Sequence, residues 1–304
     1  MDVNVVYNTS YEMPLGYLIA TYFYLTGLSA GSFVVSVIAT IGGKKEYKPI
    51  GRIGAVMAPI LLILAPMTLI VDLEQPFRFW HLFLYLNLKS PITYGSFLLS
   101  AYPINGLIYA WYLFTGREKI AKILGIIGIP LALATHGYTG FILALGKGRA
   151  LWSTALMPTL FIISAMVSGV ALMILLAVIR NRYFFKGKPA EEKLEDEKLI
   201  SGLTKFLGAF IIADLFLVFN DILVLMTSTE EALGVAKLIL FGDFSWEFLV
   251  IEIFLGGFVP LFLIFNSKVN RYMKSTVIAS LLTLIGVYSM RVVVVIAGQS
   301  LPLH

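Results

Sequence analysis

The 304-residue chain has no cysteine and only three histidines, His81, His136 and His304. Without cysteine it can form no disulfide, hold no thiolate-bound zinc or iron–sulfur cluster and attach no c-type haem. A bis-histidine haem needs two facing imidazoles within the membrane, and only His136 falls in a long apolar segment. We therefore expect no metal site, iron–sulfur cluster or haem in this chain, and any metal redox centre must lie in another subunit.

Charge is also scarce. Charged residues make up 13% of the chain and hydrophobic residues 59%, with a mean hydropathy of +0.88, whereas soluble domains carry about 25% charged residues. This excludes a water-soluble globular protein. At about 20 residues per span, the length accommodates about eight membrane spans. We expect an all-α, polytopic integral membrane helix bundle, a single domain over residues 1–304 in the cytoplasmic (inner) membrane, with lipid rather than nucleic acid around it.

Five apolar stretches are free of charge, and three more enclose ionisable residues. A charged segment at 181–203 separates these two groups and is expected to be a cytoplasmic helix or linker. The first 12 residues contain no Lys or Arg, so they lack the positive region of a secretory signal, and the first helix is expected to be kept. The expected spans are about 14–42, 52–72, 91–115, 121–146, 152–179, 204–226, 247–266 and 275–297.

The distribution of basic residues predicts the orientation. One set of alternate loops contains 17 of the 23 Lys and Arg residues, and the other set contains 5. Since cytoplasmic loops are enriched in Lys and Arg, both termini are expected outside.

Two loops on the expected outer face are longer than turns require. Loop 73–89 is rich in aromatic residues and too short to span the membrane, so we expect it at the interface. Its residues Arg78, Trp80 and His81 are candidates for docking a partner subunit, although aromatic anchoring to the membrane explains Trp80 equally well. In loop 227–246, the Ser-x-x-Glu pattern at 228–231 predicts a short capped helix.

Four charged residues lie inside the last three spans, away from the span ends: Asp214, Asp221, Glu252 and Arg291. Each costs about 2.5–3.5 kcal/mol at a helix centre and therefore needs a partner or a water-filled cavity. Asp214 and Asp221 are two helical turns apart, so both project from one face, about 10 Å apart. These four residues are a candidate proton pathway from the cytoplasmic side. Alternatively each carboxylate pairs with a cation, and Asp221 with Arg291 is one such couple because both lie near the outer ends of their helices.

A second polar set is expected in the outer half of the membrane. Helix rise places Tyr22, His136 and Tyr138 about 12, 14 and 10 Å below the outer face, and Asp72 closes its helix on that side. Such groups suit hydrogen bonds to two carbonyl oxygens and the transfer of protons. For His136 the alternative is a hydrogen bond to a neighbouring helix. The spacings Gly27-x-x-x-Gly31 and Ser164-x-x-x-Ser168 favour close helix packing.

Several segments resemble one known family. The segments at 22–31 (YFYLTGLSAG), 72–80 (DLEQPFRFW), 90–96 (SPITYGS) and 136–140 (HGYTG), followed by Leu151, Trp152 and Pro158, are similar to the NrfD/PsrC type of polysulfide-reductase membrane subunit. The resemblance covers most of the first 170 residues in order. Beyond them it depends on the eight-span topology and on Arg291.

The resemblance implies a quinone-reactive membrane anchor with both termini outside. Such an anchor docks on its outer face to a ferredoxin-like iron–sulfur subunit, which connects it to a molybdopterin or other catalytic subunit. Tyr138 falls on the family's quinone-binding tyrosine, while Tyr22 stands where a relative has a histidine, and His136 is the candidate to replace that histidine. The cofactor would be menaquinone or ubiquinone.

The resulting hypothesis is a quinone/quinol-reactive membrane subunit of a respiratory oxidoreductase. It would exchange electrons with an iron–sulfur partner and protons with a pocket in the membrane, coupled to proton translocation, and would not act alone on the terminal substrate. The alternative is a secondary transporter whose site near the bilayer midplane uses Asp214.

Overall fold

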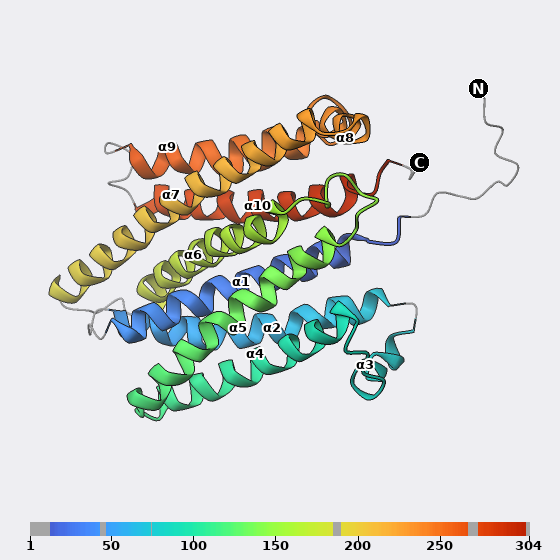
Figure 1. The fold of residues 1–304 in the computed structure, drawn as a ribbon. Coiled ribbons are helices and arrows are strands. Elements are labelled where there is room, and N and C mark those ends of the chain that lie inside the picture. Colours follow the sequence, from blue (N-terminus) through green and yellow to red (C-terminus); the bar gives the residue numbers. More distant parts are fainter. Residues whose placement is uncertain (1–12, 43–46, 74, 185–189, 267–272, 302–304) are drawn as a thin grey trace, which may run out of the picture.

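The computed structural model describes residues 13–42, 47–73, 75–184, 190–266 and 273–301. Within these ranges the chain is helical and contains no strand. Its elements are α1 (Tyr17–Ile41), α2 (Lys48–Asp72), η2 (Pro76–Arg78), α3 (His81–Leu84), α4 (Pro91–Phe114), α5 (Glu118–Ala144), α6 (Leu156–Phe184), α7 (Ala190–Thr227), α8 (Glu230–Phe241), η3 (Trp246–Phe258), α9 (Val259–Phe265) and α10 (Met273–Ala297) (Figure 1).

Eight of these segments are long and apolar enough to cross a membrane. They correspond to the eight expected spans, so the prediction of an all-α polytopic bundle is confirmed. The seventh expected span is made of two elements, the π-helix η3 and α9. Much of segment 181–203 is helical, because α6 extends to Phe184 and α7 begins at Ala190. Its residues 185–189, like the first 12 residues of the chain, lie outside the described part.

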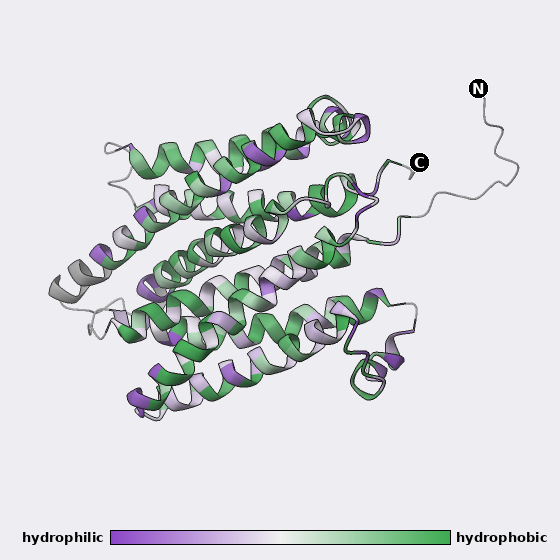
Figure 2. Cartoon of the chain, viewed as in Figure 1, coloured by the Kyte–Doolittle hydropathy of each residue, from purple (hydrophilic) through white to green (hydrophobic). Residues whose placement is uncertain are grey.

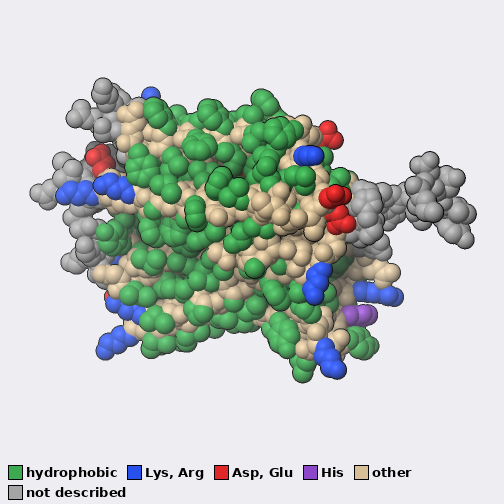
Figure 3. Space-filling model, turned by 45° about the horizontal axis from the view of Figure 1, so that its top comes forward, with side chains coloured by type: hydrophobic (Ala, Val, Ile, Leu, Met, Phe, Trp, Pro, Cys, Tyr) green, Lys and Arg blue, Asp and Glu red, His purple; other side chains and the backbone are tan. Residues whose placement is uncertain are grey.

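The surface of the bundle matches a membrane environment. On the face shown in Figure 3, hydrophobic side chains cover the middle of the bundle and charged side chains lie mostly toward its two ends, and the ribbon coloured by hydropathy has the same distribution (Figure 2). The short helices α3 and α8 lie at the same end as Leu301, which we call the α8 end (Figure 1). At the opposite end, Lys48 pairs with Glu118 at 2.7 Å, a half-exposed ion pair of the kind that contributes little to stability. The protein is therefore a multi-pass integral membrane protein.

The expected short helix in loop 227–246 is present as α8, but its cap differs from the Ser-x-x-Glu prediction. The hydroxyl of Thr229 caps the helix by accepting a hydrogen bond from the Ala232 amide at 3.2 Å. Ser228 instead donates to the Val224 carbonyl in the last turn of α7, at 2.7 Å. Because Ser228 is occupied by the preceding helix, α8 begins one residue later than the pattern predicts.

Helix α1 is the central helix and packs against α2, α5, α6 and α10. At Gly31 its backbone touches α6, where a Cβ atom would overlap the Ala165 carbonyl oxygen and approach Gly169. Such backbone contacts between helices require small residues. The packing role expected for Gly27 and Gly31 is thus seen directly at Gly31.

The α8 end is tied together by contacts between segments that are far apart in the sequence. The fully buried Gln299 side chain bonds both backbone groups of Leu15, accepting from its amide at 3.1 Å and donating to its carbonyl. The indole of Trp152 donates to the Val294 carbonyl at 2.7 Å, and Arg149 donates to the Leu301 carbonyl at 2.6 Å. The two ends of the described chain are therefore fixed to the same bundle.

Gly31→Ala is expected to destabilise the protein by about 1–3 kcal/mol, because the added methyl group forces α1 and α6 apart. Thermal unfolding in detergent measures this. Gly202→Ala on α7 is the matched control, since nothing lies within 4 Å of the added Cβ there. Equal melting temperatures for the two variants would contradict the proposed backbone contact.

Candidate functional site

The centre of the α1, α5, α6 and α10 packing is a buried pair, Arg291 on α10 and His136 on α5. Arg291 is 1% exposed and His136 has no exposed surface. One guanidinium nitrogen, Nη2, lies 3.3 Å from His136 Nε2 and also donates to the hydroxyl of Ser164. The guanidinium carbon lies 3.8 Å from the centre of the Phe161 ring, a cation–π geometry. The alternative considered for His136, a hydrogen bond to a neighbouring helix, is therefore confirmed.

The partners of His136 determine which ring nitrogen carries the proton. An arginine can only donate hydrogen bonds, so Nε2 of His136 must accept from Arg291. We therefore assign the proton to Nδ1, which is 3.2 Å from Thr26 Oγ1 and can donate to it. Thr26 in turn donates to the Tyr22 or Phe23 carbonyl, each at 3.0 Å. This series of hydrogen bonds runs from α10 through α5 to α1.

The couple of Asp221 with Arg291 that the sequence suggested is not formed. Arg291 bonds His136, Ser164 and, at 3.5 Å, the Phe161 carbonyl. Its electrostatic partners are Asp214 and Glu252, not Asp221. Similar depth in the membrane did not bring Arg291 and Asp221 together, because the rotation of each helix about its own axis decides which side chains meet.

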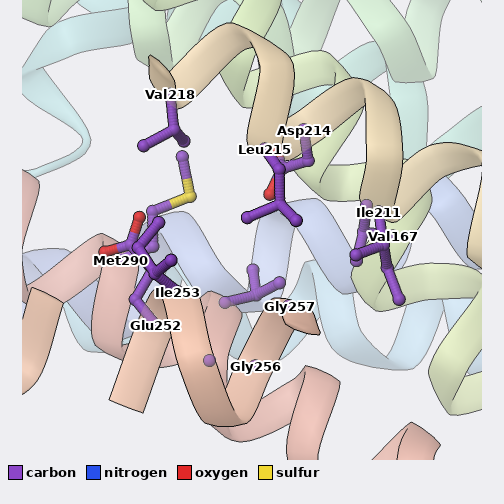
Figure 4. Close-up of a pocket in the computed structure, with 12 residues that line it drawn as sticks. Val167, Ile211, Asp214, Leu215, Val218, Glu252, Ile253, Gly256, Gly257 and Met290 are labelled. Carbon is purple, nitrogen blue, oxygen red and sulfur yellow. The ribbon is translucent and has the colours of Figure 1, made fainter. Parts of the chain in front are cut away.

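The remaining guanidinium nitrogens of Arg291, Nε and Nη1, have no hydrogen-bond partner among the described residues. The same holds for one oxygen of each of Asp214, Asp221 and Glu252. Asp214 and Glu252 line one small cavity (Figure 4). Glu252 and Asp221 line another. The candidate proton pathway thus consists of four side chains in one region, each with a polar atom free to bind water.

The two candidate quinone-binding tyrosines lie on a different side of α5. Tyr138 packs against α4 at Gly95, where a Cβ atom would overlap the tyrosine ring and its hydroxyl. Tyr138 also interacts electrostatically with the buried Tyr22 of α1. No hydrogen bond of either hydroxyl is found in the described part of the chain. Both hydroxyls are therefore available to a ligand, and Gly95 is the residue that makes room for the Tyr138 ring.

Asp72 lies at the end of α2, beside the start of α1. Its Oδ1 atom is 3.7 Å from the position that a Cβ atom on Gly16 would occupy. Gly16 precedes Tyr22 by six residues, about 9 Å along the helix. Asp72 is therefore nearer the membrane surface than the tyrosines and lies on the route from them to the α8 end.

His136 and Tyr138 do not line one pocket, contrary to the expectation that they converge. Two residues apart on a helix, they point in directions about 200° apart. His136 faces Arg291 and Gly27, whose Cβ atom would lie 3.0 Å from the imidazole, whereas Tyr138 faces Gly95. The predicted set of four therefore divides into a tyrosine group and a buried His136–Arg291 pair.

The expected docking residues surround an open pocket of about 650 Å³ at the α8 end. Arg78 and His81 line it, and Trp80 stacks edge-on against His81 with ring centres 4.0 Å apart. Trp80 is 46% exposed and Phe77 is 90% exposed. This surface is apolar, aromatic and carries the cation Arg78.

Sequence reasoning missed Thr26, Ser164 and Phe161, which hold the His136–Arg291 pair. Hydroxyls spaced along apolar helices were the available signal, but they usually bond their own backbone, as Ser168 does to Ser164. No group of three or more His, Cys, Asp or Glu residues that would hold a metal ion is found among the described residues.

Comparison with known proteins gives one family and several relatives. The family model described as "Polysulphide reductase, NrfD" matches residues 5–302. The protein is 29% identical to the Hdr-like menaquinol oxidoreductase integral membrane subunit of Archaeoglobus fulgidus, over 96% of its own length and 73% of that relative. It is 28% identical to a subunit of the selenate reductase of Mesobacillus selenatarsenatis (97% and 76%) and, also at 28%, to one of the chains of the polysulfide reductase of Wolinella succinogenes (93% of each).

The hydrogen bonds of His136 predict its tautomer. Nitrogen-15 NMR of histidine-labelled protein at neutral pH is expected to show the proton on Nδ1 and a bare Nε2, with the His136 signals identified by their loss in His136→Gln. In Arg291→Met the donor to Nε2 is removed, so this preference is expected to weaken. Finding the proton on Nε2 in the unmodified protein would contradict the geometry.

Proposed function

The chain belongs to the polysulphide reductase NrfD family, and we propose that it is the quinone/quinol-reactive membrane subunit of a respiratory oxidoreductase complex in the cytoplasmic membrane. Its relatives bear the names of subunits of menaquinol oxidoreductase, selenate reductase and polysulfide reductase. A subunit of this kind works with partners that act on the terminal substrate. Menaquinol is the quinol that the name of the Archaeoglobus relative favours.

The observation that carries this proposal is the pair of tyrosines, Tyr22 and Tyr138. The two side chains interact electrostatically, and no hydrogen bond of either hydroxyl is found among the described residues. A quinone head group presents two carbonyl oxygens, and phenol hydroxyls are suitable donors to them. The residues present therefore fit a quinone or quinol. When bound, the quinol supplies two electrons and two protons.

The protein's own residues would bind the head group and accept its protons. Tyr138 donates a hydrogen bond to one oxygen, and Tyr22, deeper on α1, orients the ring. Asp72, nearer the surface, accepts a proton and passes it toward the α8 end. We assign His136 a positioning role rather than direct contact, because both of its nitrogens are engaged, by Arg291 and by Thr26.

Electrons require a partner, since this chain has no cysteine to hold a cluster. We propose that a ferredoxin-like iron–sulfur subunit docks at the α8 end, followed by a catalytic subunit. The pocket with Arg78 and His81 and the neighbouring Trp80 is the proposed contact. Exposed aromatics with an arginine are typical of the centres of protein interfaces. This assignment makes the α8 end the outer face.

We also propose that quinol oxidation is coupled to proton translocation through Asp214, Asp221, Glu252 and Arg291. Their unpartnered polar atoms and shared cavities support this role. The same acids were the basis for the transporter alternative. The relatives named above are subunits of oxidoreductases, and this favours the oxidoreductase role over the transporter.

Tyr138→Phe is expected to lower quinol-dependent electron transfer by about 10²-fold or more, because the group that donates to the reacting oxygen is lost. The measurement is oxidation of a short-chain naphthoquinol by the purified complex, with ferricyanide as acceptor.

Tyr102→Phe is the matched control, since Tyr102 is a buried tyrosine whose hydroxyl bonds Ser29 at 3.2 Å, away from the tyrosine pair. It is expected to turn over at the wild-type rate. Wild-type turnover in both Tyr138→Phe and Tyr22→Phe would remove the proposed quinone site.

A further inference from the structure

The three carboxylates of the last spans are arranged as two from one helix and one from the helix facing it. Asp214 and Asp221 lie on α7, two turns and therefore about 10 Å apart. Glu252 of η3 shares one cavity with each of them. Asp221 is 7% exposed, and its Oδ1 atom has neither solvent contact nor a partner in the described residues. Asp214 Oδ1 and Glu252 Oε2 are also buried and have no hydrogen-bond partner in the described residues.

Two cavities connect these oxygens. The first, of about 20 Å³, is lined by Asp214 from α7 and by Glu252, Gly256 and Gly257 from η3 (Figure 4). The second, of about 30 Å³, is lined by Glu252 and Asp221. Either has room for about one water molecule, and polar walls make water a suitable occupant. Among the ionisable residues of these linings, Glu252 alone belongs to both.

Val218 and Met290 border both cavities and form the apolar partition between them. A proton that moves from one cavity to the other therefore has Glu252 as its carrier. Glu252 lies in the π-helix η3, a conformation that is rare and often found at functional sites. Next to it, Gly256 and Gly286 leave only backbone between η3 and α10, so no side chain at these two positions restricts the Glu252 side chain.

The cavities continue toward the α8 end. The second cavity is lined by Leu151, Ile239 and Val294, and a larger open pocket of about 620 Å³ is lined by Ala150, Val235 and Gly298. Ala150 is next to Leu151 in the chain, and Val235 and Gly298 lie one helical turn from Ile239 and Val294, respectively. Thr229, Glu230 and Glu231 at the start of α8 also border the open pocket. The second cavity therefore lies about one helical turn from the open pocket under α8.

In the opposite direction the first cavity ends against apolar side chains. Ile211 and Val167 close it, and both belong to a buried apolar cluster with Leu207, Ile264 and Met173.

Arg291 supplies a positive charge close to the buried carboxyl groups. Its guanidinium is fixed by His136 and Ser164 and interacts electrostatically with Asp214 and Glu252. One positive charge offsets one negative charge on the acids, so the set can hold one deprotonated carboxylate that is ready to accept a proton.

From this arrangement we infer that Asp214, Glu252 and Asp221 form a proton relay that opens at the α8 end, with Glu252 as the link between two single-water cavities. Once Asp221 has released its proton, the Glu252 carboxyl gives its proton through water to the Asp221 carboxylate. The Asp214 carboxyl then gives its proton through water to the Glu252 carboxylate, so that one deprotonated site moves through the set. Each transfer leaves the donor as a carboxylate, and no electrons move. The inference rests on the proposed function only for the source of the protons.

Deuterium exchange of the Asp214 carboxyl tests the relay in the purified complex without quinol turnover. The protonated C=O infrared band of Asp214, identified by its loss in Asp214→Asn, is followed after mixing with deuterated buffer. In Glu252→Gln the exchange is expected to be at least about tenfold slower, because the carrier between the cavities is lost. Glu252→Asp keeps a carboxyl and is expected to retain most of the wild-type rate. Glu197→Gln, an exposed change on α7, is the matched control and is expected to exchange normally.

The absence of cysteine allows the opening to be tested separately. Gly234 lines the open pocket, so Gly234→Cys labelled with a bulky maleimide would block it. Labelling is expected to slow Asp214 exchange at least about tenfold relative to the unlabelled variant, with labelled wild-type complex as the control for partner cysteines.

Several results would overturn the inference. Fast exchange in Glu252→Gln, or no protonated Asp214 band at any pH, would exclude the relay. Undiminished exchange after the pocket is blocked would exclude the opening at the α8 end. If the relay holds while Tyr138→Phe turns over quinol normally, only the proposed quinone site fails.

Discussion

The arrangement of this bundle depends on how a single buried guanidinium is satisfied. In a membrane, an arginine without partners is so costly that its surroundings must be built around it. Arg291 meets this requirement with the imidazole of His136, the hydroxyl of Ser164 and the face of Phe161, and His136 is in turn fixed by Thr26. Four helices, α1, α5, α6 and α10, are held in register by these contacts.

The same contacts separate two kinds of chemistry. On one side, α1, α4 and α5 bring Tyr22 and Tyr138 together, next to the glycine that admits the Tyr138 ring. On the other side, α7 and η3 present acids to small cavities. Arg291 interacts with the acids, and His136 belongs to the helix that carries Tyr138.

The sequence predicted the helices well because hydropathy and charge act locally, and the eight spans agree with the structure. It also predicted that Asp214 and Asp221 share a face, since their spacing is two turns. It was wrong about the Asp221–Arg291 couple and about the convergence of His136 with Tyr138, because depth along a helix does not determine rotation about its axis. The two-residue spacing of His136 and Tyr138 already indicates that the two side chains point to nearly opposite sides of α5. The sequence included Glu252 in the proton pathway but could not place it beside both Asp214 and Asp221, since a π-helix changes the residue period.

The position of Arg291 in the last of the eight spans has a consequence for biosynthesis. Spans enter the membrane in order, so His136, Ser164 and Phe161 are in place before the helix that needs them is made. Gln299 follows the same span and bonds the backbone at Leu15, in front of the first. A polypeptide interrupted before α10 therefore leaves a bare imidazole in its interior and an untied first helix. The last helix thus completes the fold.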